Sequence, residues 1–444
     1  MSSTTTATRV GGPRARRGIF ARWDGVTVLT VYLVLLLAIP SVMVLSPLGS
    51  AGSPSTVVAV ALFLLWLWFQ VHDAGRPGRT GQPLRRAVLV WLVVMVAVYA
   101  HAMAGPVSPD EVSPADFGML KVIGFCGVLL VTADGIRDMV RLRIFASRVV
   151  VAISVVAVLG LLQFVSREVI VDRLHVPGLT SVPSTGLIDR GGLPRPSGTS
   201  THPIEYGVVL SIGFPLAVVH ALWSPRRRWF YAGCTGVIAL DIFLSSSRSA
   251  LVCTILGLLV LAASWSTALR LKAVLATAAA TAVVYVVVPG SLGATTRLFT
   301  GAGTDPSIAS RTGSYDLAAV FFSHSPWLGR GFGTFLPKYW IFDNAYLGFL
   351  VEGGVIGLAG LLAVIVVALW SARRAAAALA EPADRQLARG LLAAGISGAA
   401  GLAFFDGFGF PQSAGCLFLV LGLTGALHRI AVRTKAPAPD VVVR

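Results

Sequence analysis

The stretch that decides the fold runs from Ala345 to Trp370 and reads AYLGFLVEGGVIGLAGLLAVIVVALW, with Glu352 as its single charged residue. About 20 consecutive apolar residues are enough for a helix to cross the hydrocarbon core of a bilayer. The stretch therefore predicts a membrane-spanning helix. The small residues between Gly353 and Gly360 predict close contact with a neighbouring helix.

The rest of the chain has the same apolar character. Of its 444 residues, 55% are hydrophobic and 13% are charged, and the mean hydropathy is +0.78. Soluble domains carry roughly 25% charged residues. This composition excludes an ordinary cytosolic enzyme, a secreted disulfide scaffold and a disordered protein. The first apolar run, from about Val26, is long enough to span the membrane, so we expect no cleavable signal peptide.

Twelve apolar segments are predicted to span the membrane, which makes the fold an all-α integral membrane protein. The segments are 26–46, 56–71, 87–104, 117–133, 144–165, 204–222, 229–244, 249–264, 272–289, 345–370, 387–405 and 411–428. A polytopic domain at 26–428 thus separates a basic cytoplasmic tail at 1–25 from a second cytoplasmic tail at 429–444. Two long outer segments, about 166–203 and 290–344, interrupt the spans, and the second is expected to carry a short amphipathic helix.

The distribution of charge orients this arrangement. With a cytoplasmic N-terminus, alternate connections place 26 of the 36 Lys and Arg residues inside and 13 of the 20 Asp and Glu residues outside, as the positive-inside rule expects. The net charge of +16 is then a topology signal with anionic lipids as its partner, not nucleic acid. The four cysteines lie in apolar runs without metal-ligand spacing, so we expect buried thiols.

The first candidate motif, Arg195 to Glu205, lies outside and directly before the sixth span. A helix N-terminus facing outward is an anion site, because its free N–H groups and positive dipole end point at the ligand. Thr201 or Ser200 is expected to cap this helix, with Pro203 in its first turn. Arg195 adds a guanidinium fork that matches phosphate oxygens. The alternative is a rigid loop, with His202 bonded to the loop itself.

The second motif, Ser245 to Ser249, repeats this design before the eighth span. Ser247 is a candidate helix cap and Arg248 a candidate anion ligand. Asp241, one turn earlier, is expected to pair with Arg248. The alternative is a polar hairpin turn whose arginine extends to the lipid headgroups.

The third motif contains Arg311 at the start of a surface helix that ends at Ser325-Pro326, followed by Arg330. Gly331 and Gly333 either form a nest of N–H groups for an anion or are plain turn residues.

The fourth motif, Asp343-Asn344-Ala345-Tyr346, opens the tenth span. Asp343 is either the cap of that helix or a general base beside the arginines. Glu352, nine residues further on, is expected about 13 Å deeper in the membrane.

Several arginines and outward helix N-termini thus face one side of the membrane. A lipid-linked pyrophosphate fits this arrangement, because it is a polyanion at headgroup level with a hydrocarbon tail in the bilayer. The outer face shows no Asp-x-Asp pair or His/Cys cluster, so we expect no metal and no cofactor, and the arginines would neutralise the charge.

The order of these motifs resembles the O-antigen ligase/polymerase superfamily of polytopic glycosyltransferases. The resemblance covers about 165–370 and rests on Arg195 to Pro203, the Ser-Ser-Arg248-Ser turn, Arg311 before Pro326, and Asp343-Asn344-x-Tyr346-Leu347 to Gly357. It implies a GT-C-like, metal-independent, inverting glycosyltransferase that uses glycans on undecaprenyl pyrophosphate. Ligases of this family typically carry a histidine before the tenth span, where this chain has Asp343.

The resemblance implies that Arg195, Arg248 and Arg311 hold the leaving pyrophosphate. Asp343 departs from the family's pattern, and we expect it to be the base, with Glu205 as runner-up. His202, Glu205, Ser247, Arg330, Asn344 and Tyr346 are expected to bind substrate. We expect a surface-polysaccharide polymerase in the bacterial cytoplasmic membrane, with an outer-face site, a glycan acceptor and a chain-length regulator as a further partner. Alternatives are a ligase that transfers the finished glycan to a lipid, protein or wall acceptor, a transporter or flippase of lipid-linked glycans, and a structural or regulatory partner.

Overall fold

The computed structural model describes residues 24–46, 52–72, 82–181, 187–190, 192–287, 293 and 306–435. Residues 1–23 and 436–444 of the predicted tails, and residues 290–292 and 294–305 of the second outer segment, lie outside these residues. The helices are α1 (Gly25–Ala38), α2 (Pro54–His72), α3 (Pro83–Ala104), α4 (Pro109–Gly135), α5 (Met139–Ser166), α6 (Pro203–Trp223), α7 (Arg228–Leu244), α8 (Arg248–Ala262), α9 (Thr267–Val287), α11 (Pro306–His324), α12 (Ala345–Ala378), α13 (Pro382–Gly401) and α14 (Pro411–Lys435).

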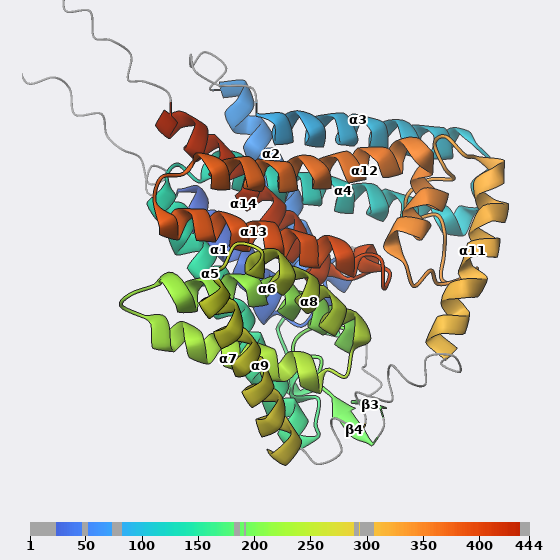
Figure 1. Ribbon diagram of the computed structural model, residues 1–444. Coiled ribbons are helices and arrows are strands. Elements are labelled where there is room, and N and C mark those ends of the chain that lie inside the picture. The colour runs from blue at the N-terminus through green and yellow to red at the C-terminus, as the bar shows by residue number, and fades with distance from the viewer. Residues whose placement is uncertain are drawn as a thin grey trace, which may run out of the picture.

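Two short antiparallel ladders and two 3-10 turns complete the described elements. Strand β1 (Met43–Val44) pairs with β2 (Thr180–Ser181), and β3 (Ile188–Arg190) pairs with β4 (Leu193–Arg195). The 3-10 turns are η3 (Ile170–Arg173) and η5 (Gly407–Gly409). All four strands belong to the connections between helices, so the fold is an α-helical bundle (Figure 1).

Each of the twelve predicted segments overlaps a helix of the bundle. Within the described ranges, seven helices are long and apolar enough to cross a membrane: α2, α3, α4, α5, α6, α12 and α14. The total of twelve spans remains a prediction. The first segment is shorter than expected, because α1 ends at Ala38 instead of continuing to residue 46. Pro40 explains this end, since a residue before proline is driven out of the helical region and Ile39 has extended backbone angles.

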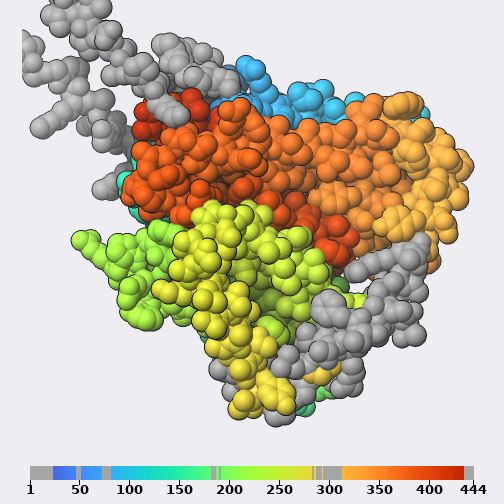
Figure 2. Space-filling view, in the orientation of Figure 1, coloured from blue at the N-terminus to red at the C-terminus, as the bar shows by residue number. Residues whose placement is uncertain are grey.

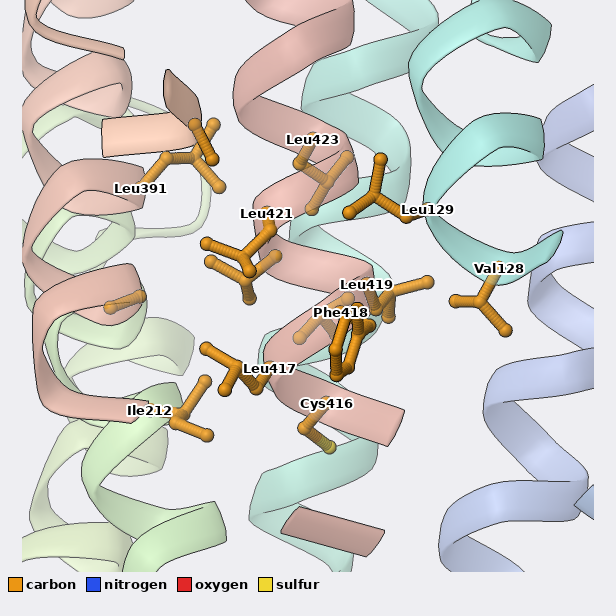
Figure 3. Packing of buried hydrophobic residues seen from close by; sticks show 14 of the residues in the cluster. Val128, Leu129, Ile212, Leu391, Cys416, Leu417, Phe418, Leu419, Leu421 and Leu423 are labelled. Atoms are coloured by element: carbon orange, nitrogen blue, oxygen red, sulfur yellow. The ribbon is translucent and has the colours of Figure 1, made fainter. Parts of the chain in front are cut away.

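The centre of the bundle is α14, which packs against α4, α6, α12 and α13. Figure 3 shows Leu417 and Phe418 of α14 facing Ile212 of α6 and Val128 of α4. The ring of Phe418 stacks on Phe125 with centroids 4.6 Å apart and planes 4° from parallel. Such close packing holds membrane helices together, because lipid is as apolar as the side chains themselves.

The two ends of the bundle carry different groups. At one end, Gly25 of α1 lies against Gly135 at the end of α4, and Arg429 of α14 bonds to the Ala133 carbonyl. The other end carries the described connecting residues 167–181, 187–190, 192–202, 245–247, 325–344 and 402–410 and is called the site end below. There Ser41 N–H donates to the Thr199 carbonyl, and α11 lies across the ends of neighbouring helices (Figure 1).

Helix α12 is broken inside the bundle. Gly354 has φ +63° and ψ −173°, so two helical halves meet there at a kink. Each half finds its hydrogen bonds in the loop after α11: Gly331 N–H donates to the Glu352 carbonyl, and Val355 N–H donates to the Pro326 carbonyl. A Cβ at residue 354 would lie 2.3 Å from the Trp327 carbonyl oxygen, so only glycine fits this approach.

Candidate functional site

Arg195 lies at the centre of the candidate site. It is the last residue of β4 and is 6% exposed. Its Nε donates a hydrogen bond of 2.9 Å to the carbonyl oxygen of Ser245, in the turn between α7 and α8. The first and second predicted motifs are therefore in direct contact, although 50 residues separate them in the sequence.

The turn that receives Arg195 is built as the sequence predicted. Ser247 is the N-cap of α8, its Oγ accepts from Ala250 N–H, and Arg248 is the first residue of the helix. Ser246 has φ +46°, a strained conformation for a residue other than glycine. Strain of this kind gathers at functional turns that the surrounding fold holds in place. The turn presents a half-buried Arg248 beside a helix N-terminus.

The predicted pairing of Asp241 with Arg248 is wrong. Asp241 is fully buried, and within the described ranges neither of its carboxylate oxygens has a hydrogen bond. A Cβ at Gly160 would meet both the Tyr206 hydroxyl and Asp241 Oδ1, so these two polar groups share one small space between α5, α6 and α7.

The N-terminus of α6 differs from the prediction in its cap. His202, not Thr201 or Ser200, is the N-cap, and its Nδ1 accepts from Ile204 N–H at 3.1 Å. Pro203 occupies the first helical position as expected. Burial, with a smaller contribution from the charge of Arg195, lowers the pKa of His202 to about 4. His202 is therefore neutral at pH 7, which is the form that can accept this bond.

Glu205 has a structural role in the fold. Its carboxylate is fully buried and accepts from the backbone N–H groups of Thr201, Gln412 and Ser413, at 2.9, 2.7 and 3.4 Å. It thus joins the loop before α6 to the first turn of α14. Three such bonds occupy the carboxylate, which favours a positioning role over that of the runner-up base.

Two glutamines that the sequence analysis missed fix the loop of Arg195. Gln163 of α5 donates to the Gly198 carbonyl and accepts from Gly198 N–H, both at 2.8 Å. Gln412 of α14 accepts from Ser200 Oγ at 2.6 Å and donates to Thr199 Oγ1 at 3.0 Å. The available signal in the sequence was an amide side chain inside an apolar segment, where every polar group needs a partner. In the structure both glutamines are fully buried.

In the fourth motif, the residue that caps α12 is not Asp343, the candidate from the sequence. Asn344 is the N-cap of α12, and its Oδ1 accepts from Tyr346 N–H and Leu347 N–H at 3.0 and 3.3 Å. The interpretation of Asp343 as the cap is therefore wrong. Asp343 is half-buried, and among the described residues its carboxylate makes no hydrogen bond. The Tyr346 hydroxyl donates to the Ala399 carbonyl at 2.7 Å, which fixes α12 to α13.

Backbone contacts bring Asp343 close to a second carboxylate. Ala345 N–H donates to the carbonyl oxygens of Leu402 and Phe405, at 2.8 and 3.0 Å. Asp406 follows Phe405 and lies within electrostatic range of both Asp343 and Lys121 of α4. Lys121 and Asp406 were not predicted as site residues; the lysine inside an apolar segment was the available signal.

The glycines after α11 do form an N–H nest, but its anion is internal. Gly331 and Gly333 have φ +110° and +89°. The N–H groups of Gly333 and Phe335 donate to Glu352 Oε1 at 3.0 and 3.1 Å. Glu352 belongs to the first half of α12, before the break at Gly354, and its carboxylate holds the loop that follows α11.

The remaining predicted residues belong to this loop and to α11. Arg330 Nη2 donates to Glu111 Oε1 at 2.5 Å, and its guanidinium lies 5.4 Å from the Phe321 ring centroid and 5.3 Å from that of Tyr339. The same Glu111 oxygen accepts from the Tyr339 hydroxyl. This pair joins the loop to α4. Arg311 is in α11, but its side chain lies outside the described residues.

The described residues contain no group of three or more His, Cys, Asp or Glu side chains that could hold a metal ion. The four cysteines are free and buried.

A known protein family matches part of this chain. Residues 233–362 match the model of the O-antigen ligase family, and this region contains Arg248, Arg311 and Asp343. A comparison with curated proteins gives no match. Among solved structures, a chain from a study of polymerisation and crosslinking by a peptidoglycan synthase complex is similar, with 16% identity and a TM-score of 0.40 over 77% of this chain and 97% of that chain. The resemblance of this chain to the O-antigen ligase superfamily is thus confirmed by the family match over residues 233–362.

Proposed function

We propose that this protein is a glycosyltransferase that moves a glycan from an undecaprenyl-pyrophosphate carrier to a hydroxyl group of a second glycan, as a surface-polysaccharide polymerase. The family match supports a membrane enzyme that ligates or polymerises glycans. The observation that carries the proposal is the hydrogen bond from Arg195 to Ser245, because it fixes a buried guanidinium against the turn that carries Arg248. We place the site on the outer face of the bacterial cytoplasmic membrane.

The arginines supply the electrostatic part of the reaction. A cation held rigidly beside a helix N-terminus stabilises the charge that develops on a leaving pyrophosphate and needs no reorganisation during the reaction. Arg195 and Arg248 provide this charge, and Arg311 is proposed as the third member. Such donors are typically worth about 10²–10³ in kcat.

The chemical step is a displacement at the anomeric carbon of the donor glycan. The acceptor oxygen forms a bond to that carbon, and the bond to the pyrophosphate oxygen breaks with its electron pair. Asp343 takes the hydroxyl proton, because its carboxylate is half-buried and makes no hydrogen bond among the described residues. The configuration at the carbon inverts, since the acceptor attacks the face opposite the leaving group.

A ligase would use the same donor site and differ only in its acceptor. Ligases of the resembled family typically carry a histidine where this chain has Asp343, which favours the polymerase. A flippase needs polar groups along a path through the membrane. Arg195 instead lies in a connection at the site end, Arg248 is the first residue of α8 directly after another, and Asp241 is closed off in the bundle.

The test uses purified protein in lipid nanodiscs with a short undecaprenyl-pyrophosphate-linked glycan. Lipid-linked products are separated on a gel for wild type, Arg195→Ala, Arg248→Ala and Asp343→Asn. Arg226→Ala is the matched control, because Arg226 is an exposed arginine in the connection at the opposite end of the bundle.

We expect a product ladder from wild type and from Arg226→Ala, and its loss from the other three variants. Product on a lipid, protein or wall acceptor without a ladder would establish the ligase. Movement of the donor across the bilayer without any new glycosidic bond would establish the flippase.

A further inference from the structure

A long apolar groove lies between α8 and α9. It has a volume of about 970 Å³ and is lined by residues that include Ile255, Leu259 and Ala262 of α8 and Val274, Ala278 and Tyr285 of α9. These side chains are almost entirely hydrocarbon. The groove is therefore suited to a flexible hydrocarbon chain and not to a sugar.

The α8 side of the groove continues the helix face that begins with Arg248. Ile255 and Leu259 follow Arg248 by seven and eleven residues, which is two and three helical turns. Residues at these spacings lie on one face of a helix. Ile255 lies about 10 Å along the helix axis from Arg248. One face of α8 thus presents a cation at the site end and apolar side chains below it.

The opposite end of the groove is bounded by Arg270. Its Nε donates to the Ala262 carbonyl at 2.8 Å and its Nη2 to the Ala263 carbonyl at 3.3 Å, so the guanidinium caps the end of α8. The two ends of the groove therefore differ. Arg248 lies beyond one end along the axis of α8, and Arg270 lies at the other end.

Helix α9 is loosely packed, unlike the helices of the core. Among its residues with described side chains, none is buried, and α9 stands on the outside of the molecule (Figure 2). A helix held this weakly leaves room for a chain to enter from the side.

We propose that the groove between α8 and α9 binds the isoprenoid tail of the lipid-linked donor while Arg248 binds its pyrophosphate. This inference rests on the proposed function, since it takes the donor from there. The single face shared by Arg248 and the groove favours an anionic lipid over a second copy of the chain. The proposed function supplies the pyrophosphate donor as that lipid, and competition by phospholipid is the outcome that would contradict this choice.

The test compares two donors that carry the same glycan, one on an undecaprenyl carrier and one on a farnesyl carrier. Ala278→Trp fills the groove, and Ala276→Trp adds the same bulk at an exposed position of α9 outside the groove lining. In nanodiscs, we expect Ala278→Trp to raise KM for the undecaprenyl donor about tenfold, a loss of about 1.4 kcal/mol in binding. KM for the farnesyl donor and both values for Ala276→Trp should stay as in wild type.

A second measurement needs no turnover. A photoreactive undecaprenyl pyrophosphate should crosslink to α8 and α9 in wild type and in Ala276→Trp, and much less in Ala278→Trp. If it crosslinks while no glycan is transferred, the proposed function fails and the groove assignment stands. Equal crosslinking in all three proteins, equal competition by phospholipid, or a disulfide crosslink between two copies of the Ala278→Cys variant would overturn the groove assignment.

Discussion

The Nε atom of Arg195 donates a 2.9 Å hydrogen bond to the carbonyl oxygen of Ser245. This bond uses one edge of the guanidinium and fixes its plane. Helix α8 starts at Arg248, three residues after Ser245. Gln163 and Gln412 hold the loop of Arg195 from α5 and α14. The site end is therefore preorganised by contacts between elements that are distant in the sequence.

The kink in α12 should depend on glycine at position 354. Gly354→Ala places a Cβ 2.3 Å from the Trp327 carbonyl oxygen and forces a residue other than glycine to φ +63°. Strain of this kind costs about 1–3 kcal/mol from the backbone alone. We expect a clear fall in thermal stability, measured by tryptophan fluorescence of the solubilised protein. Gly236→Ala in α7 is the control, because a Cβ there has open space. An unchanged melting temperature for Gly354→Ala would contradict the kink.

Glu352 should stabilise the fold by holding the loop that follows α11. Glu352→Ala leaves the N–H groups of Gly333 and Phe335 without their acceptor, at about 1–3 kcal/mol for each buried group left unpaired. Glu352→Gln keeps an acceptor oxygen, so we expect most of the stability to return. Thermal unfolding of the two variants measures this order. Wild-type stability in Glu352→Ala together with lost activity would instead indicate a chemical role.

His202 should make the folding stability of the protein decrease in acid. Its pKa is lowered in the fold to about 4 by burial and by Arg195, whereas an unfolded histidine titrates near 6.5. Between these values the unfolded state binds more protons, so this contribution to stability is full above about pH 6.5 and decreases as the pH falls towards 4.

His202→Asn keeps an N-cap oxygen and does not titrate. We expect the difference in melting temperature between pH 7.5 and pH 5 to be smaller in this variant than in wild type. The comparison removes the effect of all other titrating groups. Equal differences in the two proteins would show that His202 is not held neutral in the fold.

The sequence predicted the helical segments well, because each rests on a local property. Apolar runs such as 204–222 and 411–428 coincide with α6 and α14, and Pro203 marks the first turn of α6. The turn from Ser245 to Arg248 was also predicted correctly, since a serine cap followed by a helix is a local pattern.

The errors concern contacts between distant segments. The kink at Gly354 depends on the carbonyl of Trp327, and the bonds of Glu205 depend on the start of α14. Neither partner can be identified from spacing along the chain. The sequence also could not decide which residue is the N-cap of α12, because Asp343 and Asn344 are adjacent and both residue types favour that position.

The most direct test of the central claim is a double-mutant cycle on kcat/KM for the undecaprenyl donor, with Arg195→Ala, Arg248→Ala and the double variant. If both arginines stabilise one leaving pyrophosphate, they act as a unit, and the double variant should be little worse than the more damaged single variant. Losses that multiply would show that the two arginines act independently. Wild-type activity in either single variant would contradict the account altogether.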